Sequence, residues 1–184
     1  MRGEVVPSPT VAHCASPYLE MTNVWIYDQI RSLSCYRPVV LTQAVRNRDH
    51  YPSTDVVFNH EALPAFRRMA YRGLRKWKGT YMGYQQVLIQ EGVDLMHAHF
   101  GQEGFRCLEA RRRARIPMVT SFYGLDVSVL PKQRIWFNRF QRLFAEGQLF
   151  LAEGPRMAES IEALGCPHEK IETQRLGVDL GRIT

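Results

Sequence analysis

The sequence has no apolar run of the roughly 18 residues that a membrane-spanning helix requires. Residues 1–4 are followed by Pro7 and Pro9 and include no apolar stretch that could act as a secretory signal. No Cys-x-x-Cys pair is present for zinc or redox chemistry, and the four cysteines are widely scattered, at Cys14, Cys35, Cys107 and Cys166. These absences predict a cytoplasmic protein whose cysteines stay reduced and are buried as small apolar side chains.

Common nucleotide- and metal-binding motifs are also missing. There is no Gly-x-Gly-x-x-Gly dinucleotide fingerprint, because the nearest segment, Gly101-x-x-Gly104, lacks the first glycine. No phosphate loop ending in Gly-Lys-Ser/Thr, no Gly-x-Ser-x-Gly nucleophile elbow and no His-Glu-x-x-His zinc motif occurs. We therefore predict no cofactor and no bound metal ion.

The 184 residues, of which 45% are hydrophobic and 23% are charged, are typical of one globular domain spanning residues 1–184. Short apolar segments predict strands at residues 10–15, 38–42, 56–58, 94–100, 117–122, 148–152 and 170–174. Helical periodicity occupies residues 22–33, 66–89 with breaks at Gly79 and Gly83, 103–113, 132–145 and 155–164. This alternation predicts the α/β class, with a Rossmann-like, doubly wound parallel sheet.

A basic amphipathic helix is predicted near the middle of the chain. Six basic residues and no acidic residue lie between Phe66 and Lys78, and they equal the net charge of +6. They are Arg67, Arg68, Arg72, Arg75, Lys76 and Lys78. A 3.6-residue period places Phe66, Met69 and Trp77 on one face. The helix is either an ordinary solvated surface helix or one that contacts an anionic membrane surface. Because no nucleic-acid-binding fingerprint occurs, we predict no nucleic-acid partner.

His97-Ala98-His99 forms the first cluster of chemically useful side chains. Two residues apart on a strand, both rings point to the same face. A metal could use them together with His13 or His60, but no acidic or cysteine ligand is adjacent in the sequence. Contact with a substrate and simple hydrogen bonding at the end of the strand are the two other interpretations.

The segment Tyr123-Gly124-Leu125-Asp126 follows the predicted strand at residues 117–122. It brings a hydroxyl, an unshielded backbone and a carboxylate to the edge where parallel sheets bind ligands. Asp126 could accept sugar hydroxyls or a proton, or it could cap the following turn.

Several segments, in this order, resemble glycosyltransferase family 4. They are Asp94-Leu-Met-His-Ala-His-Phe-Gly101, Ile116-Pro-Met-Val-Thr-Ser-Phe-Tyr-Gly-Leu-Asp126, Leu164-Gly-Cys-Pro167, Lys170-Ile171 and Leu176-Gly-Val-Asp-Leu180. The resemblance implies one half of a GT-B fold, in which two Rossmann-like domains face each other. It also implies sugar transfer that retains anomeric configuration and needs no metal.

The resemblance suggests roles for residues at this edge. Tyr123 and Asp126 are the candidate catalytic residues, and the candidate substrate-binding residues are Asn23, His97, His99, Gly101 and Gly124. Two features depart from the family pattern. Tyr123 stands where histidine is usual, and the loop at residues 16–23 has no glycine. Asn23 lies where exopolysaccharide-building members carry glutamate.

In family members the Leu176–Leu180 motif leads into the second domain, and here the sequence ends soon afterwards, at Thr184. We therefore expect the acceptor-binding half of a glycosyltransferase, with the donor-binding domain absent. Its partners would be a nucleotide-sugar donor, held by that missing domain, and a glycan or lipid-linked acceptor in bacterial polysaccharide biosynthesis.

Two further expectations and two alternatives follow from this interpretation. The protein would be cytoplasmic, with the basic helix as a candidate contact to the inner face of the membrane. The exposed cleft face would allow weak self-association. The alternatives are a free-standing carbohydrate-binding or regulatory module without catalysis, and a different Rossmann-like enzyme such as a nucleotide-sugar epimerase.

Overall fold

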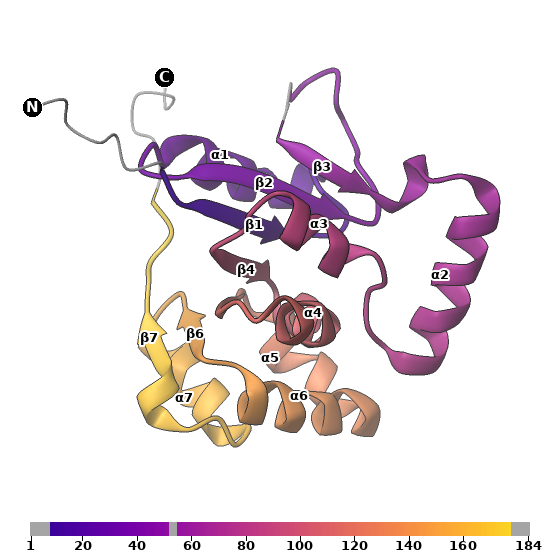
Figure 1. Cartoon of the computed structure of the whole chain (residues 1–184). Coiled ribbons are helices and arrows are strands. Elements are labelled where there is room, and N and C mark those ends of the chain that lie inside the picture. The colour runs from indigo at the N-terminus through magenta and orange to yellow at the C-terminus, as the bar shows by residue number, and fades with distance from the viewer. Residues whose placement is uncertain (1–7, 52–54, 178–184) are drawn as a thin grey trace, which may run out of the picture.

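The computed structural model describes residues 8–51 and 55–177, which form a seven-stranded parallel sheet covered by helices (Figure 1). The strands are β1 (Thr10–Cys14), β2 (Arg37–Thr42), β3 (Val56–Asn59), β4 (Leu95–His99), β5 (Met118–Phe122), β6 (Leu149–Ala152) and β7 (Ile171–Thr173). The α-helices are α1 (Val24–Ser32), α2 (Ala65–Lys78), α3 (Tyr84–Gln90), α4 (Gly101–Ala114), α5 (Leu125–Ser128), α6 (Arg134–Glu146) and α7 (Pro155–Ala163). Short 3-10 helices occupy Met21–Asn23, His60–Ala62, Leu130–Lys132 and His168–Lys170.

The predicted α/β class and the parallel sheet are confirmed, and each predicted strand is present within two residues of its expected ends. The predicted break between α2 and α3 also occurs, because Gly79 and Gly83 have backbone φ angles of +77° and +90°. The short helix α5 was not predicted. α6 begins later than expected because Leu130–Lys132 first forms a separate 3-10 turn.

The strand order β3-β2-β1-β4-β5-β6-β7 creates a topological switch point between β1 and β4. From β1 the chain builds outward through β2 and β3, then returns to place β4 on the other side of β1. The loops that follow β1 and β4 therefore leave the sheet in opposite directions. In sheets of this kind a ligand crevice forms at that point, beyond the carboxyl ends of the strands.

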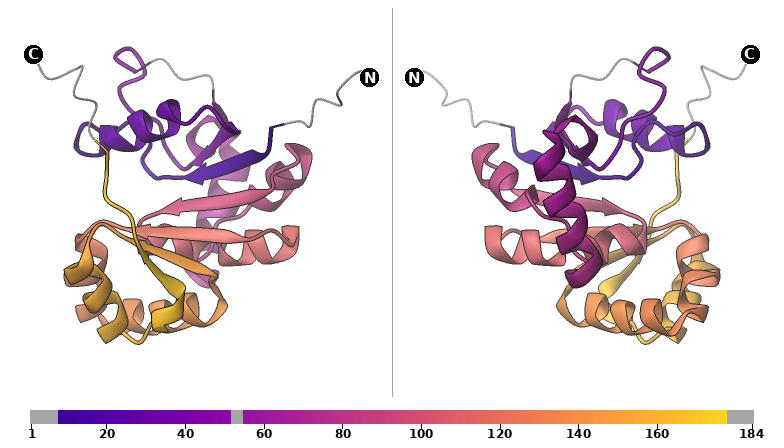
Figure 2. Two further views of the ribbon diagram at one scale, coloured as in Figure 1. Left: turned by 90° about the vertical axis from the view of Figure 1, so that its left-hand side faces the viewer. Right: turned by 90° about the vertical axis from the view of Figure 1, so that its right-hand side faces the viewer.

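Each face of the sheet has its own hydrophobic core. Figure 2 shows the sheet and its helices from two further sides. The larger core packs α3, α4, α6 and α7 against one face, to which Ala12 of β1 and Ala98 of β4 contribute. The smaller core packs Ile26 and Ile30 of α1 against the other face, beside Val40 of β2. Because side chains alternate along a strand, His13 shares the α1 face with Val40, its register partner.

Two glycines allow α4 to approach β5 closely. A Cβ atom on Gly104 would lie 2.7 Å from two side-chain atoms of Thr120, and one on Gly101 would collide with the ring of Phe122. Any larger residue at either position must push the helix away from the strand. The first turn of α4 is therefore held tightly over the carboxyl end of β5.

A buried ion pair ties α4 to its neighbours. The Glu103 carboxylate, 1% exposed, accepts hydrogen bonds from the Tyr81 hydroxyl at 2.9 Å and from Arg106 Nη1 at 2.8 Å. The Arg106 guanidinium also lies over the Trp136 ring of α6, 5.4 Å from its centroid. Burial raises the pKa of Glu103, and Arg106 opposes that shift. Removing one member leaves a buried charge uncompensated.

We expect Glu103→Ala to reduce the free energy of unfolding by about 3–5 kcal/mol, because Arg106 and Tyr81 lose their shared acceptor. Urea unfolding at neutral pH measures this change. Glu159→Ala, at an exposed position, is the matched control and should stay within about 0.5 kcal/mol of wild type. A loss below about 1 kcal/mol for Glu103→Ala would show that the pair does not anchor α4.

The predicted basic helix α2 stands at the periphery, at the opposite end of the molecule from β7 (Figure 1). None of its residues is buried. Phe66, Met69 and Trp77 are 71%, 73% and 80% exposed, so the apolar face predicted from the periodicity is turned outward. Tyr71 packs against the larger core instead.

The structure can be compared with the sequence-based predictions about membrane-spanning helices and cysteines. Among the described residues no helix has the length and apolar character needed to cross a bilayer. All four cysteines are free thiols. Burial is confirmed for Cys14, Cys107 and Cys166, whereas the prediction is wrong for Cys35, which is exposed. Cys35 lies in the turn between α1 and β2, outside both cores.

Candidate functional site

A small cleft opens at the carboxyl edge of the sheet, beside the ends of β5, β6 and β7. Its walls include Gln29 of α1, Tyr123 after β5, Glu153 after β6 and Gln174 after β7. Burial raises the pKa of Glu153, and the neighbouring Asp126 carboxylate adds to the shift. Polar side chains from four separate elements thus meet at the edge where the sheet topology places a ligand.

Asp126 joins two turns at this edge. Its Oδ1 atom accepts the backbone N–H groups of Tyr123 at 3.1 Å and Gly124 at 2.9 Å, and its Oδ2 atom accepts that of Gly101 at 2.9 Å. The side chain is 1% exposed, and burial raises its pKa while the backbone donors lower it. The predicted catalytic role of Asp126 stays a prediction. Its contacts give it a positioning role, since it holds the β5–α5 turn to the start of α4.

Gly124 is required for the shape of the same turn. Its backbone φ angle is +119°, a conformation that residues with a side chain rarely adopt. No atom would contact a Cβ built at this position, so it is the backbone angle and not crowding that demands glycine. The backbone N–H group of Gly124 donates to Asp126, and its carbonyl accepts from Val127 and Ser128. The substrate-binding role predicted for Gly124 stays a prediction.

We expect Asp126→Asn to destabilise the protein by about 1–3 kcal/mol, because an amide has one acceptor oxygen for three backbone donors. Its NH2 group would face a backbone N–H group that then has no partner. Thermal unfolding measures the loss, with Asp49→Asn at an exposed position as the control. Equal stability of Asp126→Asn and wild type would mean that the carboxylate does not hold the two turns.

Tyr123 lies at the centre of an aromatic cluster. Its ring centroid is 4.3 Å from that of Trp25 in α1 and 4.9 Å from that of Phe100 after β4. Its hydroxyl is hydrogen-bonded to His99 Nδ1 at 2.9 Å. Burial raises the pKa of Tyr123, so the phenol is neutral at physiological pH and can donate a hydrogen bond.

Sequence reasoning missed Trp25 and Phe100 as parts of this site. The periodicity of α1 predicted an apolar face that includes Trp25, but it gave no indication that this ring would cover Tyr123. Phe100 has a backbone φ angle of +80°, which is a strained conformation for a residue with a side chain. Strain of this kind is typical of functional sites, yet no feature of the sequence indicates it.

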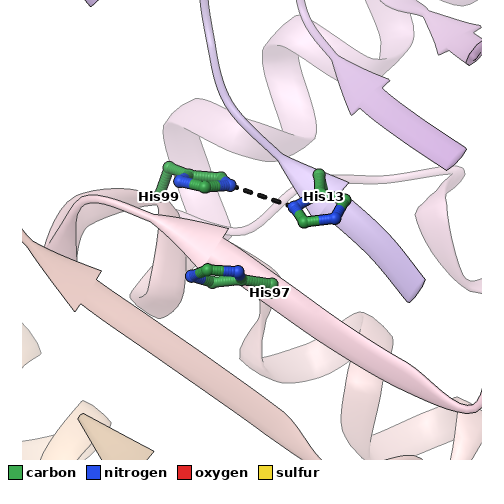
Figure 3. A group of neighbouring side chains, drawn as sticks. All are labelled: His13, His97 and His99. Atoms are coloured by element: carbon green, nitrogen blue, oxygen red, sulfur yellow. Dashed lines mark hydrogen bonds between the residues drawn. The ribbon is translucent and has the colours of Figure 1, made fainter. Parts of the chain in front are cut away.

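Three histidines gather on the α1 face at the switch point (Figure 3). His13 Nδ1 and His99 Nε2 are hydrogen-bonded at 3.1 Å, and the His97 and His99 rings stack with centroids 4.2 Å apart. Burial lowers the pKa of all three, to about 3 for His13, where His97 adds to the effect, and to about 4 for His97. For His99 the neighbouring histidines add to the lowering. All three rings are therefore neutral at physiological pH.

The structure brings together most of the predicted site residues. Of the two histidines considered as partners for His97 and His99, it selects His13, while His60 lies beside Tyr71 near α2. Asn23 precedes α1, two residues before Trp25. Gly101 donates its backbone N–H group to Asp126.

The remaining predictions fall outside this edge or outside the described chain. The six basic residues of α2 make no described hydrogen bond or ion pair with Tyr123 or the three histidines. Of the Leu176–Leu180 motif, Val178, Asp179 and Leu180 lie outside the described residues.

Residues 33–182 match Glycosyltransferase Family 4, which is well over half of the chain. The chain belongs to this family. Membership confirms the interpretation drawn from the ordered motifs between Asp94 and Leu180, which all lie within the matched residues.

The curated relatives that this chain resembles include two proteins named as glycosyltransferases of polysaccharide biosynthesis. WcaL of Escherichia coli, named for colanic acid biosynthesis, is 33% identical over 101 residues, which cover 54% of this chain and 25% of WcaL. AmsK of Erwinia amylovora, named for amylovoran biosynthesis, is 31% identical over 92 residues, covering 47% of this chain and 22% of AmsK. The chain thus matches about a quarter of the length of these relatives.

Solved structures share the fold of this family 4 domain. HepE of Anabaena, in complex with UDP, has a TM-score of 0.66 at 15% identity, with 94% of this chain and 45% of HepE covered. A UDP-GlcNAc 2-epimerase from Neisseria meningitidis, bound to UDP-GlcNAc, has a TM-score of 0.59 at 11% identity, with 89% and 45% covered. At these identities the likeness establishes the Rossmann-like fold alone.

Proposed function

We propose that this chain is the acceptor-binding half of a retaining glycosyltransferase that moves a sugar from a nucleotide-sugar donor to a glycan or lipid-linked acceptor. The observation that carries the proposal is the family 4 match over residues 33–182. Two of its motifs include β4 and β5, and the motif with β5 ends at the edge where the cleft lies. WcaL and AmsK, both named for the biosynthesis of a polysaccharide, support a growing surface polysaccharide or its lipid-linked precursor as the acceptor.

The donor would be held by a second domain that faces the carboxyl edge. This chain covers 45% of HepE, which binds UDP, and about a quarter of WcaL. These shares support an N-terminal, acceptor-side domain over residues 1–184 and a separate donor-binding domain. Without that domain the cleft face is uncovered, and we expect the isolated chain to self-associate weakly through it.

The polar lining of the cleft supports a sugar acceptor. Tyr123 lies in the cleft wall, where its neutral hydroxyl can donate a hydrogen bond to a sugar oxygen. Trp25 and Phe100 pack against the Tyr123 ring and hold it in place. Glu153 adds a carboxylate that can accept from sugar hydroxyls. His99 is fully buried and would affect an acceptor only through its hydrogen bond to the Tyr123 hydroxyl. His97 is half-buried.

In the complete enzyme that carries this domain, we expect Tyr123→Phe to lower kcat about tenfold with little change in KM. The substitution keeps the ring and removes only the hydroxyl, whose hydrogen bond is worth about 1–1.5 kcal/mol. Steady-state kinetics with the donor and acceptor varied separately measure the effect. Tyr51→Phe makes the same chemical change outside the cleft and serves as the control. If kcat and kcat/KM match wild type, Tyr123 does not contact the reacting sugar.

The isolated chain should show no turnover of any nucleotide-sugar, because transfer requires donor and acceptor within about 3–3.5 Å of each other. Product formation by the isolated chain, after contaminating enzymes have been excluded, would contradict the proposal that a second domain binds the donor. A complete protein that binds glycans without any transfer would instead support the alternative of a binding or regulatory module.

We further propose a cytoplasmic location at the inner face of the membrane, where lipid-linked acceptors would be met. The support comes from α2, whose exposed Phe66, Met69 and Trp77 form an apolar outer face. Within the described chain no Asp or Glu forms an ion pair with the six basic residues of this helix. An apolar strip bordered by unpaired cations is typical of helices that lie in the headgroup region of anionic bilayers.

Binding to anionic vesicles should weaken by about 100-fold when Arg67, Arg72 and Lys76, all exposed, are changed together to glutamate. Each basic residue near the surface contributes about 1 kcal/mol, and added salt should weaken wild-type binding as well. Vesicle sedimentation measures the affinity, and Trp77 fluorescence reports its burial. The control changes the exposed Arg31, Arg48 and Arg156 to glutamate. Equal wild-type affinity for neutral and anionic vesicles would leave α2 as an ordinary solvated helix.

A further inference from the structure

The three histidines at the switch point have a grouping that sugar transfer does not explain. His13 of β1 is the register partner of His97 of β4, and His99 lies two residues further along the same face. One ring nitrogen from each residue lies within 4.8 Å of the other two. This is the one group of its kind found in residues 8–51 and 55–177.

Each ring has a hydroxyl partner on its outer side. His13 Nε2 is hydrogen-bonded to the Tyr36 hydroxyl at 3.1 Å, His97 Nε2 to Ser121 Oγ at 2.8 Å, and His99 Nδ1 to the Tyr123 hydroxyl at 2.9 Å. This leaves His13 Nδ1, His97 Nδ1 and His99 Nε2 for the centre of the group. Histidines that ligate metals are oriented in this way, with one nitrogen on the metal and the other bonded to an oxygen.

The spacing of two of these nitrogens is close to that of a metal site. His13 Nδ1 and His99 Nε2 are 3.1 Å apart. Two imidazole ligands at about 2.0–2.1 Å from a tetrahedral Zn²⁺ are separated by about 3.3 Å. The His97 ring stacks on that of His99 at an interplanar angle of 28°, so it must turn out of the stack to direct a nitrogen at the same ion. Imidazole nitrogens without carboxylates favour zinc and similar transition metals over Mg²⁺ and Ca²⁺.

We propose that His13, His97 and His99 bind a zinc ion, with a fourth coordination position open toward the half-buried His97 side. Three protein ligands with water in the fourth position are known from catalytic zinc sites, whereas structural zinc sites have four protein ligands. The ion would link β1 to β4 and, through His99, fix the hydroxyl of Tyr123. The proposal concerns the binding of the ion and its effect on Tyr123, and it assigns the ion no part in the metal-independent transfer expected for the family.

The test uses the chain purified without a histidine tag and stripped of metal with a chelator. Titration calorimetry with Zn²⁺ should give one equivalent, and Co²⁺ in its place should produce the visible absorption of a tetrahedral site. His99→Ala and His13→Ala should each weaken Zn²⁺ binding by more than about 100-fold. Tyr36→Phe, which keeps all three ligands and removes one outer hydroxyl, should weaken it by about 10–100-fold.

His50→Ala and His168→Ala remove exposed histidines and should bind Zn²⁺ like wild type. Circular dichroism checks that every variant is folded. The proposal is overturned if the folded wild-type chain binds no stoichiometric Zn²⁺. It is also overturned if His99→Ala binds as tightly as wild type, or if His168→Ala abolishes binding, since the ion would then be held at the surface.

Discussion

One buried carboxylate holds together the carboxyl edge of the sheet. Asp126 accepts backbone N–H groups from two segments that are far apart in the sequence, the turn after β5 and the first residue of α4. The close approach of Gly101 to Phe122 then fixes how α4 sits on the sheet. Tyr123 and Phe100 lie in the two turns that Asp126 joins, so its hydrogen bonds to the backbone help to position both rings. Trp25 of α1 then packs on Tyr123, with the ring centroids 4.3 Å apart.

Much of the fold could be predicted because its signals are local. Strands of about five apolar residues separated by helical periods indicate a parallel sheet without any knowledge of tertiary contacts. The break at Gly79 and Gly83 could be predicted as well, since glycine readily adopts positive φ angles. The helix α5 could not, because four residues are too few to show a period.

The composition of the site depends on strand order, and local sequence does not determine strand order. His13 and His99 are 86 positions apart and meet because β4 pairs with β1 at the switch point. Trp25 contacts Tyr123 because α1 lies on the face of the sheet near the end of β5. For α2 the period correctly grouped Phe66, Met69 and Trp77, but it could not show that this face points away from the protein. Only the packing of Tyr71 against the core decides which side of the helix is buried.

We propose that the cleft between α1 and the ends of β5, β6 and β7 receives the sugar acceptor. The most direct measurement is an NMR titration of the isotope-labelled chain with oligosaccharide fragments of bacterial exopolysaccharides. Binding in this cleft predicts saturable shifts centred on the backbone amides of Tyr123, Gly124, Glu153 and Gln174 and on the indole N–H of Trp25, which packs on Tyr123. Saturable shifts confined to another surface, with these resonances unmoved, would contradict it.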